Sequence, residues 1–325
     1  MTRALVAGAG GFIGGHLVKS LLDDGIDVRA VDIKQEYEWY QSDSRAENLT
    51  LDLRELNACR KSVEGVQLVF NLAADMGGMG FIENNRALCM LSVLINTHLL
   101  KASLEQKIEK YFFAPSACVY ASNLQTSSNN PGLRETDAYP ALPEDGYGWE
   151  KLFSERMCRH FLEDFGLETR VARFHNVYGP YGTWEGGREK APAAICRKIA
   201  EAKLRNLREI QVWGDGSQSR SFMWIDDCIT GIRLLMNSNH REPINLGSNE
   251  LVTINELVSL VESIAEFRVN RIYQLNAPKG VQGRNSDNTR IREVLNWQPD
   301  TRLEIGLRKT FSWIYSQVQK RSIVK

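Results

Sequence analysis

The sequence feature that most constrains the fold is a run of glycines directly after a short apolar segment at residues 4–7. Residues 8–14 read Gly-Ala-Gly-Gly-Phe-Ile-Gly, and residues 16–22 continue as a helix. Such a short apolar run is typical of a buried parallel strand. Glycines at the turn let the backbone approach a pyrophosphate, which binds amides at the positive end of the helix. The pattern predicts a dinucleotide-binding unit.

An acidic residue after the second predicted strand indicates which dinucleotide binds. Asp32 ends the strand predicted at 28–32, about twenty residues past the glycines, where a carboxylate bonds a ribose diol and repels a 2′-phosphate. This favours NAD over NADP, although Lys34 weakens the preference. Asp52 follows a third strand and either reaches the adenine amine or caps a helix. The predicted cofactor-binding residues are Gly8, Gly11, Phe12, Ile13, Gly14, Asp32 and Asp52, together with Tyr147 and Lys151.

A tyrosine and a lysine four residues apart indicate the chemistry. If a helix begins near Tyr147, Lys151 lies one turn away on the same face, where its ammonium favours the phenolate. Free tyrosine titrates near ~10, and a general base works best with its pKa near the operating pH. Taken alone, the pair is a common helix-surface motif. Beside a nicotinamide it predicts a proton acceptor.

Further candidate residues follow the later strands. Ser116 comes after the strand predicted at 111–114, at the sheet edge where a hydroxyl meets a substrate. Cys118 in isolation is typical of a small buried hydrophobic residue. The glycine-rich segment 75–82 is either a flexible loop or a mobile wall of the site. Lys190 stands just ahead of a predicted helix, whose dipole would lower its pKa; the alternative is an exposed loop lysine.

Composition excludes several classes of partner. The 325 residues include 40 basic and 40 acidic side chains, so no overall charge attracts nucleic acid or an anionic membrane. Six scattered cysteines without C-x-x-C spacing, and histidines without a ligand pattern, indicate a reducing compartment and no metal site. The longest apolar stretch, around 88–95, is too short to span a bilayer. We expect a soluble, cytoplasmic protein.

The order of elements predicts an α/β fold. We expect a Rossmann-type, doubly wound parallel sheet with a smaller, interleaved α/β substrate-binding domain. The predicted NAD-binding domain covers residues 1–176, and residues 222–240 return to it. The predicted substrate-binding domain covers residues 177–221 and 241–325. Apolar residues around the whole helix at 88–104 indicate a subunit contact, so a homodimer is expected.

These motifs together resemble the extended short-chain dehydrogenase/reductase family, which is the NAD-dependent epimerase/dehydratase family. The likeness extends over nearly the whole chain. It is most specific to members that epimerise GDP-mannose at C3 and C5. The segments that carry it are 77–82, 116–120, 174–180, 186–194 and 283–288. Related 4,6-dehydratases carry an Asp-Glu pair where this chain has Ala117 and Cys118, which moves Cys118 from packing to catalysis.

The resemblance implies a role for each matching residue. Tyr147 would be the oxidation base with Lys151 as its partner, Ser116 the hydrogen-bonding hydroxyl, and Cys118 with Lys190 the epimerising pair. A recycled NAD would produce a transient 4-keto sugar, whose C3 and C5 hydrogens are acidic. The implied substrate-binding residues are Gly77, Met79, Ser116, Asn176, Arg188, Lys190, Lys198, Gln218, Arg220 and Arg284.

Several alternatives remain open at this stage. The substrate is GDP-mannose or a close GDP-hexose, and the product is GDP-L-galactose, or GDP-L-gulose if C5 alone is inverted. A 4-epimerase or 4,6-dehydratase would use the same initial oxidation. An NAD-sensing regulatory protein on the same scaffold is a non-enzyme alternative, which the combination of Ser116, Tyr147 and Lys151 disfavours.

Overall fold

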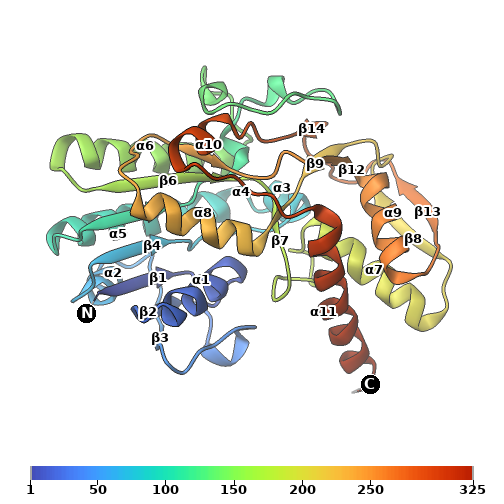
Figure 1. The fold of residues 1–325 in the computed structure, drawn as a ribbon, viewed down its shortest axis with the longest axis horizontal. Helices are drawn as coiled ribbons and strands as arrows, with labels where there is room; N and C mark the ends of the chain where they lie inside the picture. Colours follow the sequence, from blue (N-terminus) through green and yellow to red (C-terminus); the bar gives the residue numbers. More distant parts are fainter. Residues whose placement is uncertain (1, 324–325) are drawn as a thin grey trace.

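A seven-stranded parallel sheet forms the centre of the molecule in this computed structural model, which describes residues 2–323 (Figure 1). The strand order is β11-β6-β5-β4-β1-β2-β3, with the order reversing beside β1, as in doubly wound folds. The strands are β1 (Arg3–Ala7), β2 (Asp27–Asp32), β3 (Glu47–Thr50), β4 (Leu68–Asn71), β5 (Lys110–Phe113), β6 (Thr169–Phe174) and β11 (Ile244–Leu246). The predicted fold class is confirmed.

Alternating side chains on these strands bury the two faces of the sheet under different helices. In β1, Ala4 and Val6 pack with α1 (Phe12–Asp23) and α8 (Ile225–Asn237). Leu5 and Ala7 point the other way, into a core that includes residues of α2 (Leu56–Val63), α5 (Ser92–Glu105) and α6 (Tyr147–Phe165). Side chains alternate between the two faces of the sheet, and helices cover both faces. Side chains that point either way are therefore buried and apolar, which explains the uninterrupted apolar run in the sequence.

The smaller part of the molecule carries three short sheets beside the large one. They pair β10 with β7, β9 with both β12 and β14, and β13 with β8. These strands are β7 (Val177–Tyr178), β8 (Glu209–Trp213), β9 (Ser219–Ser221), β10 (Met223–Trp224), β12 (Leu251–Thr253), β13 (Asn270–Gln274) and β14 (Gly283–Arg284). The helices are α7 (Ala191–Arg205), α9 (Ile254–Ala265), α10 (Thr289–Leu295) and α11 (Leu303–Ile323).

The domain division stays a prediction, and the position of one strand differs from it. Strand β11 pairs with β6 in register Ile244 to Ala172, so it completes the large sheet. The predicted division places residues from 241 onward in the smaller domain. Ile244, Asn245 and Leu246 are all buried, and β11 forms the edge of the large sheet beside β6.

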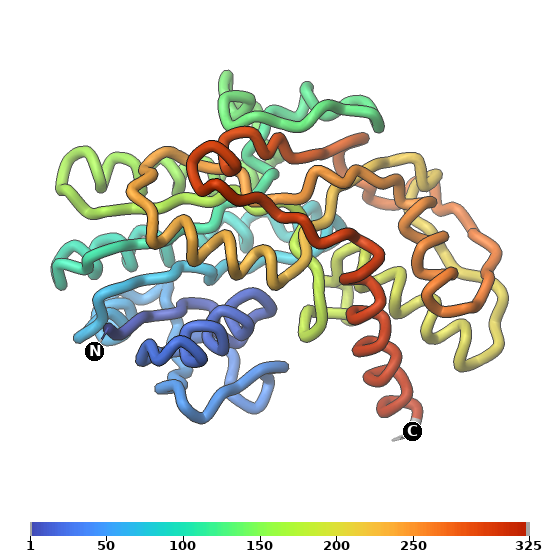
Figure 2. Tube along the Cα trace, in the orientation of Figure 1, coloured from blue at the N-terminus to red at the C-terminus, as the bar shows by residue number. Residues whose placement is uncertain are grey.

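A long segment between β5 and α6 crosses to the C-terminal part of the chain. It contains the short helical turns η2 (Ala117–Val119), η3 (Ser122–Leu124) and η4 (Glu135–Ala138). The amide of Leu133 donates to the carbonyl of Asn285 at 3.0 Å, and the amide of Gln282 donates to Gln125 at 3.0 Å. Figure 2 shows the two stretches side by side along the top of the molecule. This crossing brings Cys118 near Arg284.

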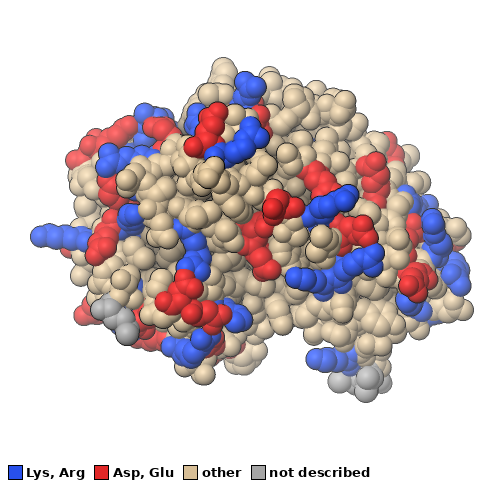
Figure 3. Space-filling model, in the orientation of Figure 1, with Lys and Arg blue, Asp and Glu red and all other residues tan. Residues whose placement is uncertain are grey.

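The segment Arg86–Glu105 is, by length and composition, long and apolar enough to cross a membrane. It extends beyond the apolar stretch noted at 88–95. It comprises α4 (Arg86–Met90) and α5, and follows α3 (Met79–Asn84); it packs against α2, α6 and β4 as part of the domain. On the face drawn in Figure 3, basic and acidic side chains are interspersed.

Candidate active site

The turn between β1 and α1 forms a cradle with no room for side chains. Gly8 has φ +84°, and a Cβ there would lie 2.9 Å from the amide nitrogen of Ala73 on the neighbouring strand end. A Cβ on Gly14 would lie 2.1 Å from the carbonyl oxygen of Gly8. Gly11 is the N-cap of α1 and supplies no capping side chain. The first-turn amides therefore remain available at the positive end of the helix, which fits a diphosphate.

The two acidic residues predicted to bind the cofactor, Asp32 and Asp52, differ in their hydrogen-bond and ion-pair partners. The Asp32 carboxylate accepts the backbone amide of Lys34 at 3.0 Å, and no cation within residues 2–323 forms a salt bridge with it. The Lys34 ammonium instead donates to the carbonyl of Gly10. Asp52 pairs with Arg54 at 2.6 Å, which lowers its pKa. The residues at the first two strand ends thus fit the diphosphate and ribose of NAD, and the placement of Asp32 favours this over a 2′-phosphate.

The tyrosine and lysine lie on one face of α6, as predicted, but a third residue accompanies them. The Lys151 Nζ lies 5.5 Å from the centre of the Tyr147 ring. Its nearest anion is the Glu150 carboxylate at 3.0 Å, and both side chains are buried. Ser154 Oγ donates to the other Glu150 oxygen at 2.8 Å. Burial raises the pKa of Tyr147 well above its ordinary value; Cys118 and Glu150 raise it further, and Ser116 lowers it.

Ser116, Cys118 and Tyr147 meet at the end of β5. Ser116 is the N-cap of η2, where its Oγ accepts the Cys118 amide at 3.3 Å. Cys118 and Tyr147 share one small buried cluster. Helix α6 lies so close to this turn that a Cβ on Gly148 would stand 2.4 Å from the Cys118 carbonyl oxygen. The glycine next to Tyr147 is therefore required by packing of the site.

Two loops distant in sequence form one wall. The amide of Gly78 donates to the carbonyl of Arg188 at 3.0 Å, and a Cβ on Gly77 would lie 3.2 Å from the Arg188 Cα. The Arg188 guanidinium pairs with Asp75 at 2.8 Å. Next to this contact, Lys190 is the N-cap of α7. Burial lowers the pKa of Lys190, whereas a charged Cys118 would raise it. The direction agrees with our prediction, but burial is the main cause.

The remaining predicted substrate residues lie on the smaller part of the molecule and in the loops beside it. Arg220 donates to three backbone carbonyls, and burial followed by the charge of Arg284 lowers its pKa to about 10. Three other side chains also donate to backbone carbonyls: Asn176 to Ser221, Lys198 to Gln211 and Gln218 to Trp213. A Cβ added to Gly280 would lie 3.2 Å from the Met79 side chain. Lys198 therefore lies on the α7 and β8 side, while Arg284 lies directly on the Cys118 sulfur.

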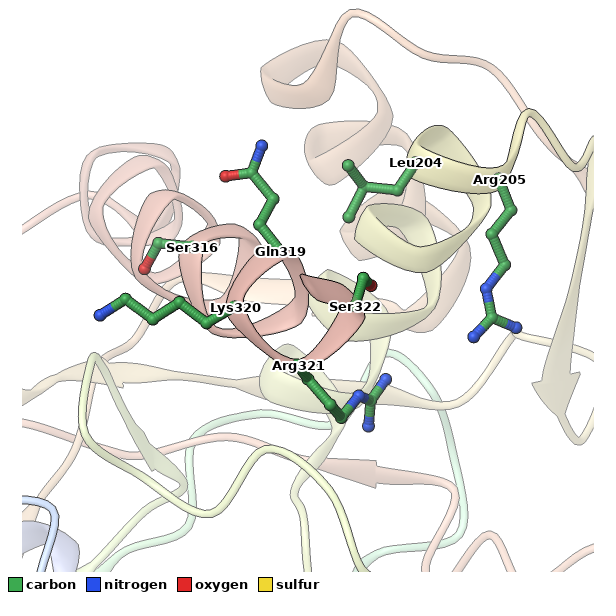
Figure 4. Close-up of a pocket in the computed structure, with 7 residues that line it drawn as sticks. All are labelled: Leu204, Arg205, Ser316, Gln319, Lys320, Arg321 and Ser322. Carbon is green, nitrogen blue, oxygen red and sulfur yellow. The ribbon is translucent and has the colours of Figure 1, made fainter. Parts of the chain in front are cut away.

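Sequence reasoning missed three polar residues of this site, two of them buried and Glu144 partly buried. They are Gln125, Glu144 and Glu150. The sequence offered a local signal for Glu150, because this acidic residue directly precedes Lys151 in the helix. Gln125 and Glu144 had none, because their partner Arg284 is more than a hundred residues away. A separate hollow of about 820 Å³ between the ends of α7 and α11 is lined by none of the predicted site residues (Figure 4).

Comparison with known proteins identifies the class that this fold and site define. Residues 4–247 match the NAD dependent epimerase/dehydratase family, and the chain belongs to it. A UDP-glucose 4-epimerase from Thermotoga maritima, solved with UDP-glucose, has the same fold, with a TM-score of 0.87 at 24% identity, covering 98% of this chain and all of that one.

Within that family the chain groups with the GDP-mannose 3,5-epimerases. It is 46% identical to the enzyme of Arabidopsis thaliana, over 97% of this chain and 82% of that protein. It is also 46% identical to GDP-mannose 3,5-epimerase 1 of Oryza sativa subsp. japonica, over 98% of this chain and 83% of that protein. The resemblance and the NAD-dependent epimerase class predicted from the sequence are confirmed.

Proposed function

We propose that this protein epimerises GDP-D-mannose at C3 and C5 to GDP-L-galactose through a transient 4-keto sugar, with NAD recycled. The identity to GDP-mannose 3,5-epimerases over 97% of the chain supports the substrate and reaction. The observation that carries the chemistry is the meeting of Cys118 with Tyr147 at one buried site, with Lys190 at the adjoining helix start. A 4-epimerase would need no second proton-transferring pair there.

The roles of the chain's own residues follow from what inversion requires. When bound, NAD would supply the chemistry of hydride removal and return at C4. Tyr147 takes the proton of the 4-hydroxyl, and Ser116 forms a hydrogen bond to the same oxygen. Lys151 would bond the ribose of NAD and supply a positive charge beside Tyr147. Hydrogens next to the 4-ketone are then acidic, and inverting each carbon requires a base on one ring face and an acid on the other. Cys118 and Lys190 are the pair that we assign to those faces.

The cofactor and substrate assignments are the ones that the sequence suggested. Gly8, Gly11 and the first turn of α1 with Phe12, Ile13 and Gly14 would hold the diphosphate of NAD, Asp32 its ribose and Asp52 its adenine end. Arg220 is our assignment for the substrate diphosphate, because a guanidinium that is bonded only to carbonyls keeps its full charge. The other substrate-binding residues are Gly77, Met79, Asn176, Arg188, Lys198, Gln218 and Arg284.

We also propose a homodimer in the cytoplasm. Where α4 joins α5, Met90 and Leu91 are each 46% exposed, and on the adjacent α6, Trp149 and Phe153 are 45% and 58% exposed. Large apolar side chains on neighbouring helices form a surface suited to a second copy of the same chain. All six cysteines are free, as a reducing compartment requires.

The test is proton NMR of GDP-mannose with the purified protein in deuterium oxide. We expect the C3 and C5 hydrogens to exchange and GDP-L-galactose to form; exchange at C5 alone would indicate GDP-L-gulose. Cys118→Ala should lose about 10²–10⁴-fold of the exchange rate while still oxidising C4. Wild-type exchange in this variant would refute the assignment. Stabilisation of the protein by NAD but by no sugar nucleotide would favour the regulatory alternative.

A further inference from the structure

Glu150 is a buried acidic residue of the site that the proposed mechanism does not use. Its Oε2 lies 3.0 Å from the Lys151 ammonium, although the two residues are consecutive on α6. The side chains of Glu150 and Lys151 are only 1% and 3% exposed. Because water screens this pair very little, the carboxylate acts on the ammonium more strongly than a surface carboxylate would.

The Glu150 carboxylate is itself held from the next turn of the helix. Ser154 Oγ donates to its Oε1 at 2.8 Å. The carbonyl of Ser154 in turn accepts the Asn96 Nδ2 at 3.3 Å, which ties this turn of α6 to α5. A carboxylate with one oxygen bonded to a hydroxyl and the other beside an ammonium has few orientations left. These contacts therefore fix where the charge of Lys151 lies.

Aromatic rings complete the surroundings of the ammonium. Lys151 Nζ lies 5.3 Å from the centre of the Phe113 ring and 5.5 Å from the centre of the Tyr147 ring. Both distances are within the range at which a cation is attracted to a ring. An ammonium has three N–H donors, and Glu150 engages one side of it. The remaining donors fit the two hydroxyls of a ribose, the group that Lys151 is proposed to bond.

The other titratable groups around Lys151 and Tyr147 do not replace Glu150. Burial raises the pKa of each neighbouring cysteine, so these side chains are thiols near neutral pH. Within residues 2–323, no other carboxylate forms an ion pair with Lys151, and the neighbouring arginines pair with carboxylates of their own. The surrounding groups are Cys118 on η2, Cys89 and Arg86 on α4, Tyr111 on β5, Arg173 on β6, Glu155 and Cys158 on α6, Asp75 and Arg188 on the two loops, and Lys190 at the start of α7.

We propose that Glu150 is a positioning residue that acts through Lys151: its carboxylate keeps the ammonium charged and beside the Tyr147 ring, and Ser154 fixes the carboxylate. The inference rests on the proposed roles of Lys151 and Tyr147. The charged ammonium bonds the ribose and stabilises the phenolate that takes the proton of the 4-hydroxyl. In a water-poor interior, an ammonium without an adjacent carboxylate favours its neutral form.

The first test is a double-mutant cycle on NAD affinity, which needs no sugar nucleotide. NAD binding is measured by calorimetry for the wild type, Glu150→Gln, Lys151→Met and the double variant. We expect Glu150→Gln to weaken binding about tenfold on its own. Beside Lys151→Met it should have no effect, because Glu150 acts only through the ammonium. Additive losses, or wild-type affinity in folded Glu150→Gln, would overturn the proposal.

The second test is the pH profile of kcat with GDP-mannose, which a merely structural role would not move. Burial raises the pKa of Tyr147 well above its ordinary value, followed by Cys118 and then Glu150. Because Glu150→Gln removes a negative charge beside the pair, its profile should move to lower pH by about one unit. Glu150→Asp keeps the charge and should keep the wild-type profile at a lower kcat.

An exposed carboxylate on the same helix provides the matched control for the pH profile. Glu163 pairs with Arg159 on the surface of α6, and Glu163→Gln removes the same charge away from the site. Its profile should coincide with that of the wild type. An unmoved profile in Glu150→Gln, or an equal shift in Glu163→Gln, would contradict the proposal.

Ser154→Ala keeps the test decisive if Glu150→Gln, which leaves a buried ammonium without its anion, does not fold. This variant retains both charges and removes only the hydroxyl that orients the carboxylate. We expect it to weaken NAD binding about threefold, and wild-type affinity would overturn the proposal. If GDP-mannose proved not to be the substrate, the proposed function would fail, while the NAD titrations would still report whether Glu150 acts through Lys151.

Discussion

Replacing Gly148 by alanine tests whether the site depends on close approach of α6 to the Cys118 backbone. The new Cβ would lie 2.4 Å from the Cys118 carbonyl oxygen and 3.1 Å from the Pro143 side chain. Contacts under 3.0 Å essentially never occur for a Cβ, so the start of α6 and the Cys118 carbonyl must separate by at least about 0.6 Å. Tyr147 and Cys118 would move apart by a similar amount.

The magnitude follows from the cost of misplacing reacting groups. A displacement near 1 Å costs on the order of 10²-fold in rate, so we expect kcat to fall by about 10- to 100-fold. Overpacking costs about 1–3 kcal/mol of stability, which the better helix propensity of alanine offsets by up to about 1 kcal/mol. The measurements are kcat for GDP-mannose epimerisation and the urea midpoint of unfolding.

A control at the other end of the same helix separates rate from stability. Gly166 has φ +71°, and a Cβ added there would meet no neighbour within 4 Å, so Gly166→Ala strains the backbone without touching the site. It should lose stability and keep kcat. Wild-type kcat in Gly148→Ala would refute the reasoning, and so would an equal loss of kcat in Gly166→Ala.

Three further predictions concern pH, assembly and the cofactor. Burial lowers the pKa of His175 from its ordinary 6.5 to about 3. Between these two values the unfolded chain binds a proton at this residue and the folded chain does not. The residue therefore lowers the stability as the pH falls below about 6.5, by about 1.4 kcal/mol per pH unit. Urea unfolding at pH 7 and 5.5 should show a smaller loss for His175→Gln than for the wild type; an equal loss would contradict this. Phe153→Glu on the exposed face of α6 should give monomers in sedimentation experiments, whereas Glu163→Gln on the same helix should not; a dimeric Phe153→Glu would rule out this interface. Asp32→Asn should weaken NAD binding more than NADP binding in calorimetric titrations, because a carboxylate repels a 2′-phosphate; an unchanged preference would remove Asp32 from the ribose site.

The residues that sequence alone located are those whose partners lie within a few positions along the chain. The glycine turn at 8–14 joins a strand to the helix that follows, and Tyr147 and Lys151 are one helical turn apart. Patterns of this kind are visible because strand and helix periodicities fix which neighbours meet.

What only the tertiary structure decided are contacts between distant segments. Arg284 reaches Cys118 across 166 positions, and strand β11 joins the large sheet beside β6 after the chain has left it. The sequence suggested Arg284 as a substrate-binding residue, and the fold also brings its guanidinium to the Glu144 carboxylate and the Cys118 sulfur. Hydrogen-bond partners at such separations are set by how the whole chain packs, and no local periodicity encodes them. Sequence thus determined the class of chemistry, while packing determined the environment in which each reacting group titrates.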